Sequence, residues 1–264
     1  MNYIIFDLEF NQAFNPKKRT RAVPNEICPF EIIQIGAIKL NNSFETISSF
    51  DRFIKPEIYK DIHPFVRRMT GITIDQLKNG KSFKNVFKKF ISFIGEEECI
   101  LCIWGMGDMK ELYRNIEYHS LNKSLVPEKY IDIQALASKY FNCPKGCNIG
   151  LKNAVEMLHI PHSNEFHNAF IDAYFTAEIF KSIPIKKLKP KTYNIEKYLK
   201  KKKKDNGKKR IDYSKMYMQF EKMFERKLTK DDKLMIKTAY MMGKTHQFVL
   251  DGTEEKEKEN QIKK

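Results

Sequence analysis

The sequence predicts an α/β domain followed by a basic helical extension. Three segments rich in β-branched and aromatic residues come first, and helical and strand segments then alternate along the chain. Near residue 181 the composition becomes Lys-rich. We therefore expect a mixed five-stranded sheet, in which a three-strand antiparallel meander is joined to parallel strands, flanked by helices. The predicted domain spans residues 1–183, and the extension spans residues 184–264.

The three-strand meander is predicted from composition and turn signals. Residues 3–10 (YIIFDLEF) form an apolar run typical of a buried strand. A loop over residues 11–30 carries prolines and a basic cluster. Residues 31–40 and 44–54 then predict two more strands, joined by an Asn-Asn turn.

The rest of the chain alternates between helix and strand. Apolar residues at helical spacing are clearest over residues 82–94, where Ser82 is a candidate N-cap. Strands are expected at residues 98–104 and near residues 130–133. The other expected helices cover residues 63–69, 73–79, 108–119, 134–141, 149–158, 168–182, 212–227 and 230–243.

The charge composition favours a polyanionic partner, because a basic surface attracts phosphate backbones over long range. The net charge is +15, and residues 181–210 contain 14 lysines and arginines against two acids, a local net charge of +12. Two interpretations of this Lys-rich stretch stay open: a solvated tail, or an electrostatic grip on a nucleic acid strand, which we favour. A lysine bias also arises from AT-rich coding without any function behind it.

Targeting signals are missing from the sequence. The N-terminal segment does not resemble a signal peptide, and no apolar run approaches the roughly 20 residues that span a bilayer. The five cysteines, an odd number, are expected to be reduced thiols. We therefore expect a cytoplasmic protein with no membrane partner, while protein partners stay unknown.

A pair of carboxylates interrupts the first predicted strand. Asp7 and Glu9 lie two residues apart, so both side chains leave one face of the strand and the apolar side chains leave the other. Neighbouring carboxylates in a mostly buried strand repel each other and lose hydration, and a bound divalent cation relieves both costs. An acidic strand face that meets solvent is the alternative explanation.

Two later segments place further acids near helix starts. Asp108 follows a Gly-Met-Gly turn after the fourth strand, where an ordinary helix N-cap is the alternative. Asn168 is a plausible N-cap, which leaves His167 in the preceding loop and Asp172 about one turn into the helix. Small residues beside Asp172 would let that helix approach the sheet closely, so that its carboxylate reaches a site above the first strand.

Together, these motifs resemble the DEDDh exonucleases, the group that includes RNase T and the proofreading subunit of bacterial DNA polymerase III. The three motifs of that family have counterparts in the right order: FDLEF with Asp7 and Glu9, GMGD with Asp108, and H-x4-D with His167 and Asp172. The second motif looks most like the Eri-type and sporulation-inhibitor-type branch. The resemblance covers about residues 1–182 and implies an RNase H-like fold.

The resemblance also implies a two-metal mechanism. Four carboxylates would hold two Mg²⁺ or Mn²⁺ ions, hard cations that prefer carboxylate oxygens. The ions would help generate hydroxide from water and stabilise the attacking and leaving oxygens. His167 would be the general base, and its loop position would let it swing in when substrate binds. The implied metal ligands are Asp7, Glu9, Asp108 and Asp172.

Five residues are candidates for contact with the terminal nucleotide. Leu8 and Phe10 are expected to shape its pocket through their backbone or side chains. Thr70 and Ile72, in the segment MTGIT, match family positions that contact the terminal base. Trp104, the sole tryptophan, is a candidate for stacking on a base, with a place in the core as the alternative.

We therefore expect a metal-dependent 3′–5′ exonuclease that hydrolyses single-stranded nucleic acid, RNA or DNA, from its 3′ end to nucleoside 5′-monophosphates. RNA is favoured over DNA on the branch resemblance alone. Two alternatives stay open. One is a regulatory factor that keeps the exonuclease fold but binds nucleic acid or protein, and the other is a proofreading subunit tethered to a polymerase through the C-terminal helices.

Overall fold

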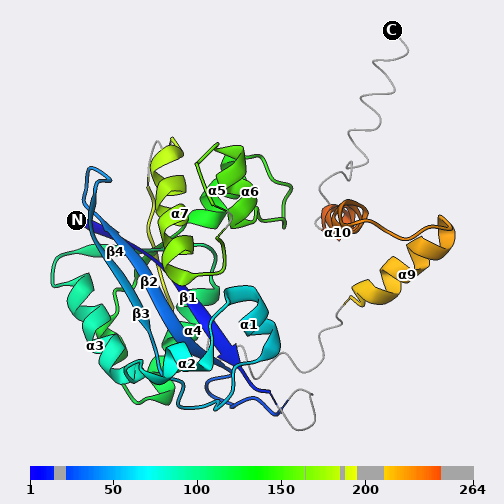
Figure 1. The fold of residues 1–264 in the computed structure, drawn as a ribbon. Coiled ribbons are helices and arrows are strands. Elements are labelled where there is room, and N and C mark those ends of the chain that lie inside the picture. The colour runs from blue at the N-terminus through cyan, green and yellow to red at the C-terminus, as the bar shows by residue number, and fades with distance from the viewer. Residues whose placement is uncertain (15–21, 164, 185–187, 195–210, 245–264) are drawn as a thin grey trace. The chain divides into compact units, whose positions relative to one another are not determined.

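The computed structural model describes most of the chain, over residues 1–14, 22–163, 165–184, 188–194 and 211–244 (Figure 1). The chain divides into two compact units, composed of residues 1–137 with 149–203, and of residues 138–148 with 204–264. Most of the Lys-rich stretch lies outside the described residues, so its role stays a prediction.

A mixed sheet forms the centre of the first unit, in the order β3-β2-β1-β4-β5-β6. β1, β2 and β3 are antiparallel neighbours, β4 and β5 run parallel to β1, and β6 is antiparallel to β5. The predicted meander joined to parallel strands is thereby confirmed. The strands are β1 (Asn2–Gln12), β2 (Phe30–Leu40), β3 (Thr46–Phe53), β4 (Cys99–Ile103), β5 (Lys129–Asp132) and β6 (Lys191–Thr192).

The sheet has six strands, one more than the sequence predicts. β6 pairs with β5 where Lys191 lies opposite Tyr130. The next residue, Tyr193, is buried, and its ring stacks on that of Tyr113 with 5.1 Å between the ring centroids. Because the flanking sequence is Lys-rich, the one apolar anchor of this two-residue strand is easily taken for part of a linker. The sheet thus extends beyond residue 183.

Helices cover both faces of the sheet, and several of them begin at side-chain caps. Thr73 forms a reciprocal capping box with Gln76 at the start of α2, and the Ser82 hydroxyl caps α3. The helices that begin in the first unit are α1 (Pro64–Thr70), α2 (Ile74–Lys78), α3 (Phe83–Ile94), α4 (Gly107–Tyr118), α5 (Ile133–Tyr140), α6 (Leu151–Met157) and α7 (Ala169–Ser182).

The larger hydrophobic core lies on the face of the sheet that α3 and α4 cover. Phe6 and Leu8 of β1 pack there with aromatic residues of α3 and with Leu112 of α4. Since side chains alternate along a strand, Asp7 and Glu9 leave the opposite face of β1. The core therefore fixes the direction in which the two acids point.

α7 packs on that opposite face, against β1 and β2. The point of closest approach is Gly36 of β2, which pairs with Asp7 of β1. A Cβ atom added to Gly36 would lie 2.2 Å from backbone atoms of Ala169 and Phe170 at the start of α7. Only glycine allows a helix and a strand to approach this closely, and the small side chain of Ala173 is buried beside the contact.

The second unit contains a helical hairpin of α9 (Tyr213–Met223) and α10 (Lys230–Lys244). In the connecting turn, Arg226 donates two hydrogen bonds, of 2.6 and 2.9 Å, to the carboxylate of Asp232. That carboxylate also accepts from the backbone N–H of Thr229 at 2.8 Å. Helices are thus present in both segments, residues 212–227 and 230–243, where the sequence predicts them. None of the described helices combines the length and apolar composition needed to cross a lipid bilayer.

We predict that Gly36→Ala lowers the free energy of unfolding by about 3 kcal/mol, because the added methyl group overlaps the backbone of α7. Urea denaturation measures the change. Gly107→Ala is the matched control, since no atom lies within 4 Å of an added Cβ there, and it should change stability by less than about 0.5 kcal/mol. Equal stability of the two variants would contradict the close helix–sheet contact.

Candidate active site

The acidic part of β1 projects beyond its parallel neighbour β4. The pairing of β1 with β4 begins at Asn2 and ends at Ile5. Asp7 and Glu9 therefore lie past the carboxyl end of β4, on a stretch of β1 that pairs only with β2 among the described strands. In open α/β sheets such positions, outside the carboxyl ends of parallel strands, are where ligands bind.

The turn after β4 brings a third acid to this place. Gly105 adopts a left-handed conformation, with φ +88°, and α4 then begins at Gly107. Asp108, in the first turn of α4, is 8% exposed. Its negative charge contributes to raising the pKa values of both Asp7 and Glu9, so it lies close enough to interact with the pair.

A fourth acid comes from the first turn of α7. Asn168 caps this helix by accepting hydrogen bonds from the backbone N–H groups of Phe170 and Ile171, at 3.0 and 3.3 Å. The cap fixes where the helix begins, and Asp172 follows one turn later on the side that faces β1. The close approach of α7 at Gly36 then brings its carboxylate to the strand.

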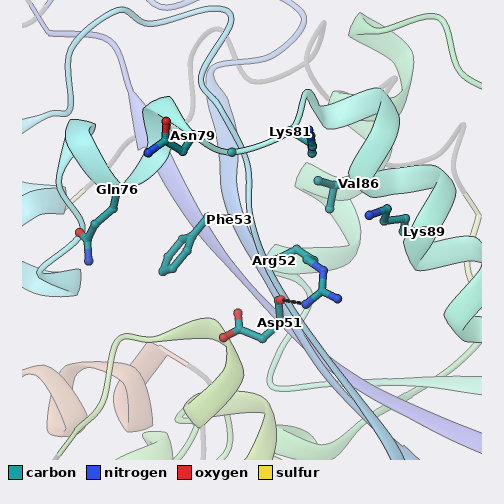
Figure 2. A pocket seen from close by; sticks show the side chains of 9 residues that line it. Asp51, Arg52, Phe53, Gln76, Asn79, Lys81, Val86 and Lys89 are labelled. Atoms are coloured by element: carbon teal, nitrogen blue, oxygen red, sulfur yellow. Dashed lines mark hydrogen bonds between the residues drawn. The ribbon is translucent and has the colours of Figure 1, made fainter.

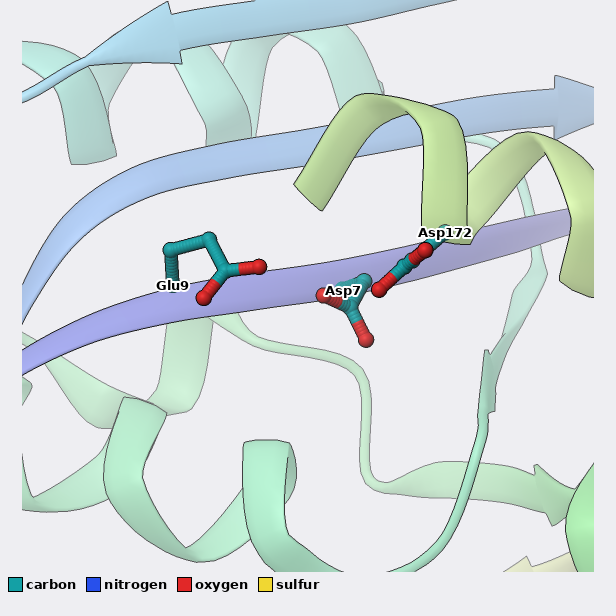
Figure 3. Close-up of side chains that lie close together, drawn as sticks. All are labelled: Asp7, Glu9 and Asp172. Atoms are coloured by element: carbon teal, nitrogen blue, oxygen red, sulfur yellow. The ribbon is translucent and has the colours of Figure 1, made fainter. Parts of the chain in front are cut away.

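Figure 3 shows the resulting group of carboxylates, with Asp7 and Glu9 on β1 and Asp172 reaching toward them from α7. One oxygen from each of the three side chains lies within 4.8 Å of the others. Asp108 is outside this tight group, although its charge acts on it. Residues far apart in the chain thus form one acidic centre.

Burial raises the pKa values of all four acids, and repulsion from neighbouring carboxylates adds to the rise for Asp7, Glu9 and Asp108. The pKa of Glu9 is about 8, raised first by burial and then by the charges of Asp172 and Asp108. Burial chiefly raises the pKa of Asp108 to about 8 and that of Asp172 to about 6. The pKa of Asp7 lies well above its ordinary value, for the same two reasons in the same order. Ionising the whole group at neutral pH is therefore costly without a cation.

The cluster of carboxylates formed by Asp7, Glu9 and Asp172 suits a divalent metal ion. Oδ1 of Asp172 is buried and has no hydrogen-bond partner among the described residues. A buried carboxylate oxygen without a donor is unfavourable, and a metal ion supplies the missing partner. Clustered carboxylate oxygens are the ligands that Mg²⁺ and Mn²⁺ prefer. Both the unpartnered oxygen and the type of ligand therefore suit such ions.

His167 lies directly before the cap of α7, in the left-handed conformation with φ +66°. Its backbone N–H donates a hydrogen bond of 3.2 Å to Oδ2 of Asp172. The residue is exposed, so the imidazole has room to move while its backbone is tied to the acidic centre. A non-glycine residue with positive φ is uncommon and often marks a functional position.

Gln34 is a positioning residue that the sequence analysis missed. It pairs with Glu9 across the β1–β2 ladder and is fully buried. Its Oε1 accepts a hydrogen bond of 3.3 Å from the N–H of Ala169, and its Nε2 donates to Asn168 at 3.4 Å and to Asp51 at 2.9 Å. One side chain thus holds the start of α7 over the acidic strand. A buried amide in an apolar strand, two residues before Gly36, was the available signal.

The two nucleotide-contact candidates on β1 have their side chains in the core. Leu8 is 3% exposed within the large hydrophobic cluster, on the face opposite Asp7 and Glu9. Phe10 is partly buried against the same cluster. For Leu8 only the backbone is therefore free to face a nucleotide, whereas the side chain of Phe10 is partly exposed.

The other three nucleotide-contact candidates differ in exposure. Ile72 is 3% exposed in a smaller cluster with Leu77, and the hydroxyl of Thr70 donates to the carbonyl of Val66 at 3.0 Å. Trp104 is half-buried at the end of β4, and its buried Nε1 has no partner among the described residues. None of the three belongs to the carboxylate group, so their contact with a nucleotide stays a prediction.

We predict that the melting temperature of the metal-free protein, measured in EDTA, falls as pH rises from 5 to 8. With pKa values of about 8 for Glu9 and Asp108, the folded state retains protons that the unfolded state releases near pH 4. The folded state therefore binds more protons in this range, and its stability decreases with pH. Mg²⁺ or Mn²⁺ should raise the melting temperature more at pH 8 than at pH 5.

Asp7→Asn is the control for this prediction, because it removes one of the repelling charges. The variant should show a shallower decrease with pH and a smaller stabilisation by metal. A wild-type melting temperature that rises steadily from pH 5 to 8 in EDTA would contradict the predicted repulsion.

Comparison with known sequences identifies relatives of this chain. The family model of the RNase T exonucleases matches residues 4–180. The 3′-5′ exoribonuclease 1 of Rattus norvegicus is 26% identical over 157 residues, which are 56% of this chain and 45% of that protein. The DNA polymerase III subunit epsilon of Buchnera aphidicola subsp. Schizaphis graminum is 29% identical over 160 residues, 56% of this chain and 63% of that protein. The chain spans about half the length of the curated exoribonucleases it matches.

Comparison with solved structures supports the same relationship. A full-length 3′-exonuclease superimposes with a TM-score of 0.57 at 24% identity, over 68% of this chain and 59% of that one, and shows the shared fold. The nuclease domain of 3′hExo, a DEDDh family member bound to rAMP, gives a TM-score of 0.56 at 25% identity, over 68% of this chain and 89% of that one. With the family model matching residues 4–180 and this fold, the chain belongs to the DEDDh exonucleases of the RNase T family.

Proposed function

We propose that the protein is a metal-dependent 3′–5′ exonuclease that hydrolyses single-stranded nucleic acid to nucleoside 5′-monophosphates. The observation that carries this proposal is the cluster of three carboxylates, in which Asp7, Glu9 and Asp172 each place an oxygen within 4.8 Å of the others. The charge of Asp108 acts on the same group. The names of the matched relatives, exoribonuclease and polymerase subunit epsilon, support the same reaction class.

The four acids are proposed to hold two Mg²⁺ or Mn²⁺ ions. When bound, such ions make water more acidic and stabilise charge on the oxygens of a phosphodiester. The side chains of Asp7, Glu9, Asp108 and Asp172 would orient the scissile phosphate through these ions. β1 and α7 are held together at Gly36 and Gln34, so the carboxylates are in place before substrate arrives.

His167 is proposed as the general base that accepts the proton of the attacking water. Imidazole suits this role because its ordinary pKa is near neutrality. The backbone of His167 is fixed by Asp172, whereas its side chain is exposed. The imidazole can therefore reach the water when a strand is bound, as its loop position suggests.

The terminal nucleotide is proposed to lie between the acidic centre and the end of α1. The backbone of Leu8 and the side chain of Phe10 would line one side, with Thr70 and Ile72 on the other, as in the family positions that they match. Trp104 would stack on a base, its unpartnered indole N–H supplying a donor.

RNA is proposed as the preferred substrate, in the reducing environment of the cytoplasm. The exoribonuclease relatives support RNA. All five cysteines are free thiols, which is consistent with a reducing compartment. We also propose that residues 1–183 provide the chemistry and that the basic extension over residues 184–264 adds affinity for long strands.

We predict that the purified protein releases nucleoside monophosphates from the 3′ end of single-stranded RNA when Mg²⁺ or Mn²⁺ is present. RNA and DNA strands labelled at either end, resolved on gels, distinguish 3′ from 5′ attack. Asp7→Asn, which keeps the shape of the side chain but removes a ligand charge, should lower the rate by at least about 10³-fold. Binding without metal-dependent release would favour a regulatory factor, and a preference for mismatched DNA ends would favour proofreading.

We predict that His167→Asn lowers kcat at neutral pH by about 10²- to 10⁴-fold with little change in KM, because it removes the base and not the binding groups. Asparagine tolerates the left-handed backbone conformation of this position, so the fold is preserved. His167→Ala, which also keeps the backbone N–H bonded to Asp172, should lose the same activity. Wild-type turnover in both variants would contradict the role.

A further inference from the structure

A hollow of about 300 Å³ lies at the exposed edge of β3, one of the two outer strands of the sheet. It contains three cations, two amides and one aromatic ring. Figure 2 shows these side chains around the end of β3, with Gln76 and Asn79 on one side and Lys81 and Lys89 on the other. The residues around the hollow are Asp51, Arg52, Phe53, Gln76, Asn79, Gly80, Lys81, Val86 and Lys89.

The geometry points to this hollow as a binding site for internal phosphates of the nucleic acid strand whose 3′ end occupies the acidic centre. This inference rests on the proposed exonuclease function. It assigns to Arg52, Lys81 and Lys89 the recognition of the strand's backbone, at a place separate from the carboxylates.

The hollow lies close to the acidic centre along the sheet. Asp51 pairs with Gly36, which in turn pairs with Asp7, so the three residues form one row across β3, β2 and β1. The row two residues further on joins Phe53, Gln34 and Glu9 in the same way. Two steps of about 4.8 Å between strands separate the backbones by about 10 Å. Arg52 belongs to the row between these two, with Ile35 and Leu8, so its guanidinium leaves the other face of the sheet. A nucleic acid strand that joins the two places therefore passes round the edge of β3.

The guanidinium of Arg52 is held in position without a carboxylate partner among the residues that the structure describes. It donates a hydrogen bond of 2.6 Å to the carbonyl of Asp51, and it lies over the ring of Phe50 at 5.5 Å from the ring centroid. Neither contact neutralises its charge. Its remaining N–H groups can donate to phosphate oxygens, for which a guanidinium is well suited.

The two lysines are attached to rigid backbone. The carbonyl of Lys81 accepts a hydrogen bond of 3.0 Å from the N–H of Lys55, and Lys81 forms a parallel bridge with Ile54. Lys89 extends from α3, whose opposite face is buried in the core. Within the part of the chain that the structure describes, neither lysine lies within 4 Å of a carboxylate. Their charges are thus available to a ligand.

The acid that borders the hollow points away from the cations. Figure 2 shows the carboxylate of Asp51 and the guanidinium of Arg52 on opposite sides of β3. The Asp51 carboxylate accepts a hydrogen bond from Gln34, which ties it to the positioning contacts of α7. The cationic side can therefore bind phosphate, while the ring of Phe53, half-buried on the other side, offers a surface for a base.

Binding of a 5′-fluorescein single-stranded RNA, measured by anisotropy over a KCl series, tests the inference. All proteins carry Asp7→Asn so that the strand is not degraded. Lys81→Gln/Lys89→Gln should reduce the slope of log affinity against log salt by about 1.4, since each lost phosphate contact of a single strand contributes about 0.7. The control, Lys84→Gln/Lys88→Gln, removes the same charge from exposed positions of α3 outside the hollow and should leave the slope unchanged.

Equal slopes for the two lysine pairs would overturn the inference, because the effect would then be one of general charge. Inorganic phosphate is then added at constant ionic strength. If it displaces the RNA, the hollow is a site for free anions, and the inference is overturned as well. When Asp7 is kept, the two double lysine variants should hydrolyse a dinucleotide at the same rate, since its single phosphodiester occupies only the acidic centre. If the wild type cleaves no dinucleotide, the exonuclease proposal fails. The anisotropy result still shows whether the hollow binds RNA.

Discussion

Electrostatic repulsion among buried carboxylates is the constraint on which the rest of this structure depends. Asp7, Glu9 and Asp172 place oxygens within 4.8 Å of one another, and Asp108 adds a further buried charge. Nothing in the carboxylates themselves favours this arrangement without a cation. It persists because backbone pairing of β1 and the apolar face formed by Phe6 and Leu8 fix the acidic face of the strand.

The position of α7 has to be equally well fixed, since Asp172 is far from Asp7 in the chain. Three contacts achieve this: the missing side chain at Gly36, the hydrogen bond from the Ala169 N–H to Gln34, and the Asn168 cap. All act on the first turn of the helix, where a small shift would displace the carboxylate most directly. The contacts between α7 and the sheet therefore offset the repulsion between Asp172 and the carboxylates of β1.

The sequence predicted the order and type of the elements because each has a local signal, such as the period-two pattern of β1 or the Ser82 cap of α3. It also placed Asp7 and Glu9 on one strand face. It could not reveal β6, whose single apolar anchor, Tyr193, lies within Lys-rich sequence. Nor could it reveal Gln34, because the importance of that amide comes from groups more than 100 residues away in the chain.

The distribution of charge separates two tasks that a nuclease has to combine. A phosphodiester is repelled by the carboxylates unless cations are bound there, so the acidic centre alone cannot attract a strand. Arg52, Lys81 and Lys89 carry the opposite charge and line the hollow at the edge of β3, two strands away from the acidic strand β1. Attraction of the strand then depends on these fixed cations and on salt, whereas the chemistry depends on metal. Since the two sets of groups are joined through Asp51 and Gln34, the sheet holds the binding and reacting positions at a constant separation.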